Sequence, residues 1–390
     1  MSEKKNVPKL RFPEFTEPWE QRKLGDLLQT LPFKQFLKEP EPDGKYEIIQ
    51  QGNEPVIGFA NGTPCGDYKD VVIFGDHTLS LYKPQHPFFV ATDGVRIVKG
   101  QQDTDGYYLL SLLERYKPQS EGYKRYYSIL ADTNCITTYN TSEQEKIGVF
   151  FKLLDNLITL HQRKLDHVKD LKKSMLQKMF PKNGQLYPEV RFPEFTDAWE
   201  QRKLGEICER ITRKNKGNES DLPLTIASQY GLIDQRDFFN KVVAAKDMTN
   251  YYLLKKGEFA YNKSYSNGFD YGSIKRLNEY EKGCLSTLYV CFGITSDEVD
   301  SDYLECFFDT LNWYHDVATI CAEGARNHGL LNVDVKAFFT DVKISLPLQK
   351  EEQKRIAECF QQVDDLITLH QRELDHLKLL KKGMLQQMFV

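Results

Sequence analysis

The sequence lacks any apolar run close to the roughly 18 residues that a membrane-spanning helix needs. It also opens without the apolar segment of a signal peptide, so we expect a cytoplasmic protein. Its eight cysteines form no C-x-x-C pair, the spacing that zinc ribbons and fingers need, and we therefore expect free, mostly buried thiols. The formal net charge of −4 gives no overall signal for nucleic-acid binding, so any charge that faces DNA must be local.

Motifs of DNA-modifying and nucleotide-hydrolysing enzymes are absent as well. There is no Asn-Pro-Pro-aromatic or Asp-Pro-Pro-aromatic run to hold an exocyclic base amine. There is no G-x-G-x-x-G after a strand, no phosphate-binding G-x-x-x-x-G-K-[ST], no G-x-S-x-G and no H-E-x-x-H. We therefore expect a recognition subunit with no catalytic residues and with no metal or cofactor bound by this chain.

What the sequence does contain is an internal repeat. Residues 8–25 return as residues 188–205 with 14 of 18 positions identical, and residues 154–180 return as residues 363–389 with 20 of 27 identical. The segments between them, 26–141 and 206–350, show no such likeness. A repeated frame thus holds two different inserts, an arrangement suited to presenting two distinct recognition surfaces in one fixed geometry.

The second part of each repeat has the spacing of a long amphipathic helix. Apolar residues recur every three or four positions, which predicts helices over residues 143–180 and 352–389. Ser142 and Glu145 fit a capping box at the first start, and Pro181 and Gly184 fit the first end. Each helix would be about 57 Å long, and its narrow stripe needs a partner. We expect the two to form an antiparallel coiled coil with pseudo-twofold symmetry, with the following seam: Leu154, Leu157, His161, Leu165, Val168, Val363, Leu366, His370, Leu374 and Leu377.

Histidines and lysines on these helices suggest further roles. His161 and His167 are six residues apart and so lie on different helix faces, which argues against a metal site. His161 and His370 fall in the apolar stripe, where a hydrogen-bonded polar spot can fix the register. Basic residues such as Lys172 and Lys381 are expected on the polar faces, either solvated or in contact with a partner protein or phosphate.

Both inserts read as mixed α+β domains. Short apolar runs separated by turn residues predict strands, and each series ends in a helical stretch. The predicted strands are 46–49, 71–74, 88–91 and 95–98, then 224–227, 258–261 and 286–292; the helical stretches are 107–115 and 301–311. We divide the chain into a first domain (1–142), a central helix (143–182), a second domain (183–350) and a C-terminal helix (351–390).

Clusters of amide, basic and aromatic side chains in the inserts are candidates for DNA contacts. Arg and Lys can reach guanine O6 and N7, and Asn and Gln can pair with adenine N6 and N7. The same residue types also populate any solvated loop, so each cluster remains a candidate. The candidates are Gln50, Gln51, Asn53, Lys124, Arg125, Arg213, Lys214, Gln229, Tyr230, Asn262, Lys263, Tyr265, Lys275, Arg276, Arg326 and Asn327.

The frame motifs resemble the specificity subunit of type I restriction–modification systems. The resemblance rests on the runs 11–15 with Trp19 and Glu20, 191–200, 346–356, 171–177 with its copy 380–386, and 72–77. One departure is that residues 137–142 lack the Leu-Pro pair found at Leu346 and Pro347 before the second helix. This departure leaves the entry of the first helix open.

The resemblance implies that each insert is a target-recognition domain reading one half of a bipartite target on double-stranded DNA, with the helices setting the spacer. It also implies two methyltransferase subunits per specificity subunit, which bind S-adenosylmethionine and dock on the helices, and restriction subunits that use ATP and Mg²⁺ for translocation and cleavage. Two other readings stay open: an adaptor whose inserts bind proteins, and a self-contained DNA-modifying enzyme.

Overall fold

The computed structural model describes residues 6–182, 184–227, 231–239, 245, 247–264, 268–327 and 330–390, with the side chains of 239, 322–327 and 330 left aside. The chain divides into two compact units. Unit 1 comprises Met1–Leu165 with Leu369–Val390, and unit 2 comprises Asp166–Thr368. Each unit therefore contains one insert and a part of both long helices.

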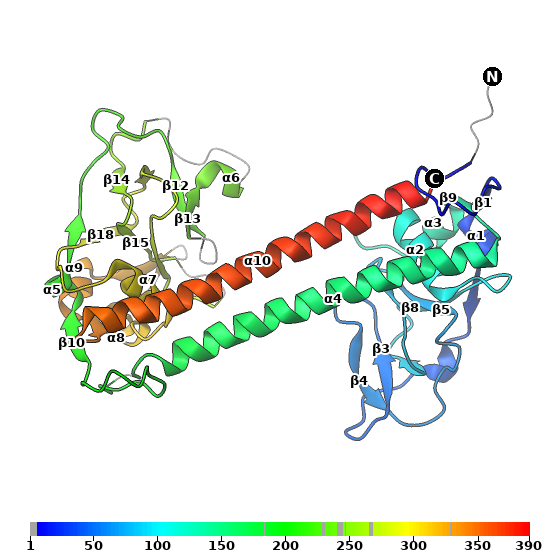
Figure 1. Cartoon of the computed structure of the whole chain (residues 1–390), viewed down its shortest axis with the longest axis horizontal. Coiled ribbons are helices and arrows are strands. Elements are labelled where there is room, and N and C mark those ends of the chain that lie inside the picture. The colour runs from blue at the N-terminus through cyan, green and yellow to red at the C-terminus, as the bar shows by residue number, and fades with distance from the viewer. Residues whose placement is uncertain are drawn as a thin grey trace. The chain divides into compact units, whose positions relative to one another are not determined.

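The two long helices predicted from the repeat are present (Figure 1). Helix α4 runs over Thr141–Lys178 and helix α10 over Lys350–Met388, so each begins two residues before the predicted start. The structure describes no helix with the combined length and apolar character of a membrane span. All eight cysteines are free, as predicted, and five of them are buried.

The insert of unit 1 is built on a four-stranded antiparallel sheet in the order β2-β8-β5-β6, with a second sheet in the order β4-β3-β7. The bounds are β2 (Leu28–Leu31), β3 (Tyr46–Ile49), β4 (Val56–Ala60), β5 (Val71–Gly75), β6 (Leu81–Tyr82), β7 (Phe88–Val90) and β8 (Val95–Gly100). The helical segments are α1 (Leu24–Leu27), η1 (Lys34–Phe36), α2 (Gly106–Tyr116) and α3 (Tyr127–Asp132). The four strands and the helix predicted for this insert are confirmed.

The insert of unit 2 repeats the four-stranded sheet in the order β11-β18-β15-β16 and adds three strand pairs, β12–β13, β14–β17 and β19–β20. The strands are β11 (Cys208–Ile211), β12 (Leu224–Ala227), β13 (Gly231–Asp234), β14 (Tyr252–Lys255), β15 (Phe259–Asn262), β16 (Ser273–Arg276), β17 (Lys282–Leu285), β18 (Val290–Ile294), β19 (Cys321–Asn327) and β20 (Leu330–Val333). The helices are α5 (Leu204–Ile207), α6 (Gln235–Phe239), α7 (Ser301–Asp309), α8 (Tyr314–Ile320) and α9 (Val335–Asp341). The strand predicted over 286–292 is wrong in its first half, because residues 287 and 288 form a turn and β18 begins at Val290.

A buried ion pair holds the start of α4 to the first frame motif. The Arg11 guanidinium donates through Nε and Nη2 to the two carboxylate oxygens of Glu143, at 2.6 and 2.9 Å. Trp19 Nε1 donates to the same carboxylate at 3.3 Å. The Glu143 side chain has no exposed surface, so its carboxylate depends on these donors in place of water.

The second frame motif repeats this arrangement at the start of α10. Arg191 donates to Glu352 at 2.7 and 2.8 Å, and Trp199 Nε1 donates to Glu352 at 3.2 Å. The hydrogen bond to Glu352 raises the pKa of Arg191 above its usual range. A short strand of each frame also pairs with the strand before its helix: β1 (Glu20–Lys23) with β9 (Asn134–Thr137), and β10 (Glu200–Lys203) with β21 (Lys343–Leu346).

The repeat also explains why α4 enters the fold normally without a Leu-Pro pair. Glu143 takes the place that Glu352 has in the second copy, and both accept from the Arg and Trp of their own frame. The predicted capping box is wrong, since the cap is Asn140, whose Oδ1 accepts from the Glu143 backbone N–H at 3.1 Å. Ser142 already lies in the helix, because the ion pair with Arg11 places Glu143 in the first turn.

Aromatic rings lock the end of one long helix against the start of the other within each unit. In unit 1, Phe389 lies 5.8 Å from Trp19 and 6.2 Å from Phe151, measured between ring centroids. In unit 2, Phe180 lies 6.1 Å from Trp199 and 5.8 Å from Phe360. The segments of α4 and α10 in each unit are therefore antiparallel, as the sequence predicted.

Two residues of the predicted seam are on the wrong face. Leu157 and Leu366 are 39% and 46% exposed, whereas Ile158 and Ile367, one position on, are partly buried. A strict heptad alternates steps of three and four residues, and that alternation selects the isoleucines. Of the other predicted seam residues, Leu154, Leu165, Val363 and Leu374 are buried and Val168 and Leu377 are partly buried.

The same heptad carries a lysine of each helix inward, which corrects their placement on the polar faces. Lys172 Nζ lies 2.8 Å from Asp364 and 3.3 Å from Asp309. Lys381 Nζ lies 2.6 Å from both Glu114 and Asp155. Burial opposes the charge of Lys172, but the two carboxylates outweigh it and raise the pKa of the lysine.

Replacing Glu352 with Gln should destabilise unit 2, because Arg191 then keeps a half-satisfied charge in a largely buried site. We expect a loss of about 3 kcal/mol in the free energy of unfolding, measured by urea titration and checked by calorimetry. Asp132→Asn, which removes an exposed partner of Lys23, should leave the melting temperature unchanged. Equal effects of the two substitutions would contradict this account of the frame.

Candidate nucleic-acid interface

The four-stranded sheets of the two units correspond strand by strand. In unit 1, β8 pairs with both β2, the first strand of the insert, and the inner strand β5. In unit 2, β18 pairs in the same way with β11 and the inner strand β15. The ladder runs in the same register in both, as these pairs show: Thr30 with Val98 and Val98 with Val72, then Arg210 with Phe292 and Phe292 with Phe259. The residues that directly follow β5 and β15 are therefore counterparts.

Unlike side chains occupy these corresponding positions. Asp76 and His77 follow β5, whereas Lys263 and Ser264 follow β15. The frame and the sheet are shared, but the chemistry at the end of the inner strand differs. This edge is where the two inserts could distinguish two ligands.

His77 joins three loops of unit 1 at this edge. Its backbone N–H donates to Gln51 Oε1 at 3.0 Å, and its ring Nδ1 lies 3.1 Å from the carbonyl oxygen of Lys124. The neighbouring Gly52 N–H donates to Ser80 Oγ at 2.9 Å. The loop after β3, the turn after β5 and the loop before α3 thus form one surface, which we call the His77 edge.

An exposed aromatic ring stands on this surface. Tyr123 is 87% exposed, and its ring stacks on the imidazole of His77 with centroids 4.6 Å apart and planes 4° from parallel. An aromatic face held this way offers a stacking platform to a base or a deoxyribose. His77 and Tyr123 were not in the set of predicted contacts, although His77 ends the run 72–77 and Tyr123 directly precedes the predicted Lys124 and Arg125.

A buried carboxylate fixes the backbone beneath the His77 edge. Asp76 is 1% exposed, and it accepts from the Tyr127 backbone N–H at 2.9 Å and from Arg96 Nη2 at 3.1 Å. Its own carbonyl accepts from Tyr126 N–H at 2.8 Å. These bonds tie the turn after β5 to α3, so the exposed groups above it are held in place.

The five candidates of unit 1 all lie at or next to the His77 edge. Gln51 supports His77, and Gln50 Nε2 donates to the Glu54 carbonyl at 2.9 Å. Asn53 and Arg125 are exposed. Lys124 pairs with Glu121 at 2.7 Å, a hydrogen bond that raises the pKa of the lysine.

In unit 2 the counterpart edge holds Asn262 and Lys263. Asn262 Oδ1 accepts from the Ser264 backbone N–H at 3.0 Å. Burial, and then the charge of Arg210, lower the pKa of Lys263 below its usual value. The Lys263 carbonyl accepts from Leu331 N–H at 2.9 Å, which brings the β19–β20 hairpin to this edge.

Other candidates of unit 2 are described only in part or lie outside the described residues. Arg326 and Asn327 belong to β19, where their backbones pair with Leu331 and Leu330. Their side chains are not described. Gln229, Tyr230 and Tyr265 lie outside the described residues.

Arg213 and Lys214 have partners within unit 2. Arg213 Nη2 lies 2.6 Å from Glu258. Lys214 Nζ sits 4.0 Å from the centroid of the Tyr252 ring and donates to the Asn250 carbonyl at 2.9 Å. Both side chains keep some exposed surface, and the ordered ammonium of Lys214 suits a backbone phosphate.

Two candidates are better explained as internal ion pairs. Lys275 and Arg276 are each 14% exposed. Lys275 pairs with Asp309 at 2.7 Å, and Arg276 pairs with Asp302 and Glu305 at 2.6 and 2.8 Å. The edge strand β16 packs against α7, and the acidic residues of that helix neutralise both cations.

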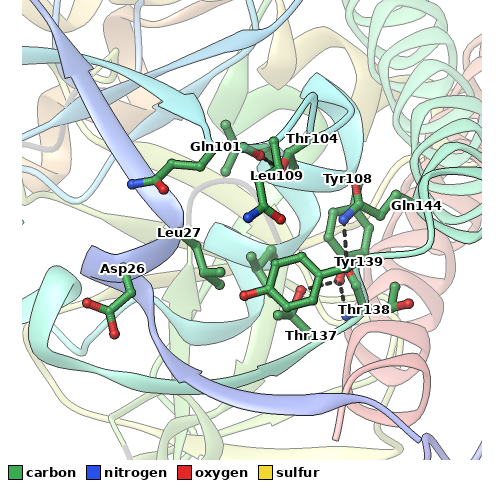
Figure 2. A pocket seen from close by; sticks show the side chains of 12 residues that line it. Asp26, Leu27, Gln101, Thr104, Tyr108, Leu109, Thr137, Thr138, Tyr139 and Gln144 are labelled. Atoms are coloured by element: carbon green, nitrogen blue, oxygen red, sulfur yellow. Dashed lines mark hydrogen bonds between the residues drawn. The ribbon is translucent and has the colours of Figure 1, made fainter. Parts of the chain in front are cut away.

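A small pocket of unit 1 beside the start of α4 is a structural cavity (Figure 2). Its volume is about 30 Å³, enough for one or two water molecules and too small for a nucleotide cofactor. Tyr108 exchanges a 2.7 Å hydrogen bond with Thr137, and Gln144 Nε2 donates to the Thr138 carbonyl at 2.6 Å. These bonds fix β9 to α2 and α4.

Comparison with known proteins agrees with this architecture. The crystal structure of a type I restriction–modification S subunit from M. genitalium is 13% identical, with a TM-score of 0.58 over 98% of this chain and 99% of that one, which shows a shared fold. Residues 196–379 match the family model of the type I restriction modification DNA specificity domain. Residues 196–379 are thus similar to the DNA specificity domain of type I restriction–modification systems, and the chain shares the fold of an S subunit.

A second solved structure supports the same fold. It comes from work on complex assembly and conformational transition of the type I R-M system, is 14% identical and has a TM-score of 0.51 over 95% of this chain and 97% of that one. No curated protein matches this chain in sequence. The match over residues 196–379 agrees with the resemblance that the frame motifs carry.

Tyr123→Ala should weaken DNA binding by the assembled complex about tenfold or more, because one stacking contact is worth roughly 1–3 kcal/mol. The fold should be unaffected, since the ring is exposed. Tyr187→Ala, at a tyrosine that directly precedes the second frame motif and is 56% exposed, is the matched control. Binding is measured by fluorescence anisotropy at fixed salt concentration, and equal affinities of both variants would remove Tyr123 from the interface.

Proposed function

We propose that this chain is the specificity subunit of a type I restriction–modification system and reads a bipartite DNA target, with unit 1 contacting one half-site and unit 2 the other. The observation that carries the proposal is the difference between corresponding strand ends: His77 with its stacked Tyr123 in unit 1, and Asn262 with Lys263 in unit 2. Two domains with the same sheet and different exposed residues at its edge are suited to binding two different DNA sequences.

The side chains at the His77 edge and at its counterpart in unit 2 are suited to contacts with DNA bases and with the DNA backbone. Asn53 and Arg125 are exposed in the loops that form the His77 edge, and amide and guanidinium groups can read adenine and guanine edges. In unit 2, Lys214 and Lys263 are suited to position phosphates. Because the chain has a net charge of −4, we infer that partner subunits supply much of the attraction to DNA.

The long helices are proposed to set the spacer between the half-sites. They contain 38 and 39 residues, about 57 and 58 Å at 1.5 Å per residue. Half-sites on one face of the duplex recur about every 34–36 Å, so helices of this length can hold two recognition domains at such a separation. The predicted domain boundaries at residues 142, 182 and 350 belong to this proposal.

The same helices offer docking sites for methyltransferase subunits. Exposed leucines recur at equivalent positions of both helices. Exposed apolar side chains that recur in this way mark surfaces for partner proteins. These are Leu157, Leu160 and Leu171 on α4, and Leu366, Leu369 and Leu380 on α10. We propose that two methyltransferase subunits cover these two equivalent surfaces.

Catalysis is assigned to the partners. The methyltransferase subunits would bind S-adenosylmethionine and methylate adenine, and restriction subunits would use ATP and Mg²⁺ for translocation and cleavage. A location in the cytoplasm, where the DNA and these partners are, completes the proposal. The adaptor alternative predicts no salt-dependent, sequence-specific DNA binding by the complex, and the enzyme alternative predicts S-adenosylmethionine binding by this chain alone.

Exchanging residues 26–141 for the insert of another specificity subunit should change one half-site only. The second insert is untouched, so unit 2 keeps its own recognition edge. The measurement is mapping of methylated adenines across the genome in cells that carry either version. A change in both half-sites would contradict independent reading.

Inserting one helical turn in the helical frame should lengthen the spacer and leave both half-sites as they are. One turn adds about 5.4 Å along the helix with little rotation of the attached domain. The same methylation mapping reads out the spacer. Altered half-site bases at an unchanged spacer would show that the helices do not set the distance.

A further inference from the structure

Two histidines and one glutamate of the long helices meet in unit 1. His161 of α4 and His370 of α10 have ring centroids 6.3 Å apart. Their Nδ1 atoms lie 3.1 and 3.2 Å from the same oxygen, Oε2 of Glu373. One potential ligand atom from each of the three residues lies within 4.8 Å of those of the other two.

Hydrogen bonding leaves this cluster incomplete. The His161 Nδ1 atom is buried and makes no hydrogen bond of good geometry among the described residues, although Glu373 Oε2 is close by. A buried ring nitrogen that faces a carboxylate without a proper hydrogen bond is costly. His370 Nδ1 already makes a 3.2 Å hydrogen bond to Glu373 Oε2, so the atom left without a hydrogen bond is His161 Nδ1. A cation between the three groups would give this nitrogen a partner and would replace the existing bond.

We propose that His161, His370 and Glu373 form a binding site for a divalent transition metal ion of the zinc class, with water as the remaining ligand. Imidazole nitrogen and carboxylate oxygen are established zinc ligands, at about 2.0–2.2 Å. A tetrahedral ion with such bonds keeps its ligand atoms about 3.3–3.5 Å apart. The observed nitrogen–oxygen distances of 3.1 and 3.2 Å need only a small outward adjustment.

The repeat shows how such a site arises. The runs 161–167 and 370–376 are identical except at one position, where Lys164 stands in the first copy and Glu373 in the second. The antiparallel pairing brings the equivalent histidines together, and the single acidic exchange adds a third ligand on one side. The spacing within one helix had excluded a metal site, but the three ligands come from two helices.

An ion held this way would tie α4 to α10 within unit 1. The unfolded chain does not bring the three residues together, so binding favours the folded state and raises the melting temperature. The site is separate from the DNA edge and needs no partner subunit. Its test therefore does not depend on the proposed function.

The experiment uses the untagged full-length chain, freed of metal with EDTA and titrated with zinc chloride in a calorimeter. We expect one zinc ion per chain, and a melting temperature raised by roughly 2–5 °C at a hundredfold excess over Kd. Cobalt(II) in place of zinc should give visible d–d absorption without a thiolate charge-transfer band. That spectrum separates this site from the eight cysteines.

Three variants decide the assignment. His370→Asn and Glu373→Lys, the second of which copies the first repeat, should each weaken zinc binding at least tenfold. Glu373 is 41% exposed, so its exchange leaves the fold intact even if the histidine variant is unstable. His376→Asn, at an exposed histidine of the same helix, should bind as the unaltered chain does. The proposal fails if the unaltered chain binds no zinc, or if Glu373→Lys binds it as tightly.

Discussion

The buried pair of arginine and glutamate at the start of each long helix is the contact on which the rest of the structure depends. Arg11 with Glu143, and Arg191 with Glu352, join a frame motif to a helix more than a hundred residues away in sequence. A tryptophan indole N–H in each copy donates a further hydrogen bond to the carboxylate. Because a buried carboxylate without its partners is very unfavourable, each helix can begin only where its own frame is in place.

This constraint separates what is constant from what varies. Frame strands, the aromatic contacts of Phe389 and Phe180, and the inward lysines recur in both units. The inserts share one four-stranded sheet but differ after its inner strand, where Asp76 and His77 follow β5 and Lys263 and Ser264 follow β15. A subunit built this way can change what it reads by altering loops, with no cost to the contacts that hold its helices.

Much of the fold followed from periodicity. The three- and four-residue spacing of apolar residues predicted the starts of α4 and α10 to within two residues. The bounds predicted for β3 and β12 are the observed ones. The errors have physical causes. Leu157 and Leu366 fit apolar spacings of three or four residues, but not the strict alternation of these spacings in a heptad. The cap at Asn140 depends on the ion pair of Arg11 with Glu143, which no local pattern shows. Lys275 and Arg276 looked free because their partners on α7 are distant in sequence.

The sequence by itself determined that the chain is a repeated frame with two unlike inserts, long paired helices and the motifs of a specificity subunit, because identity and spacing are visible without coordinates. Only the tertiary structure decided which side chains meet. It brought Gln51, His77 and Tyr123 from three loops onto one surface, and His161, His370 and Glu373 from two helices into one cluster. Such contacts are set by packing between segments far apart in the chain, and no local pattern records them.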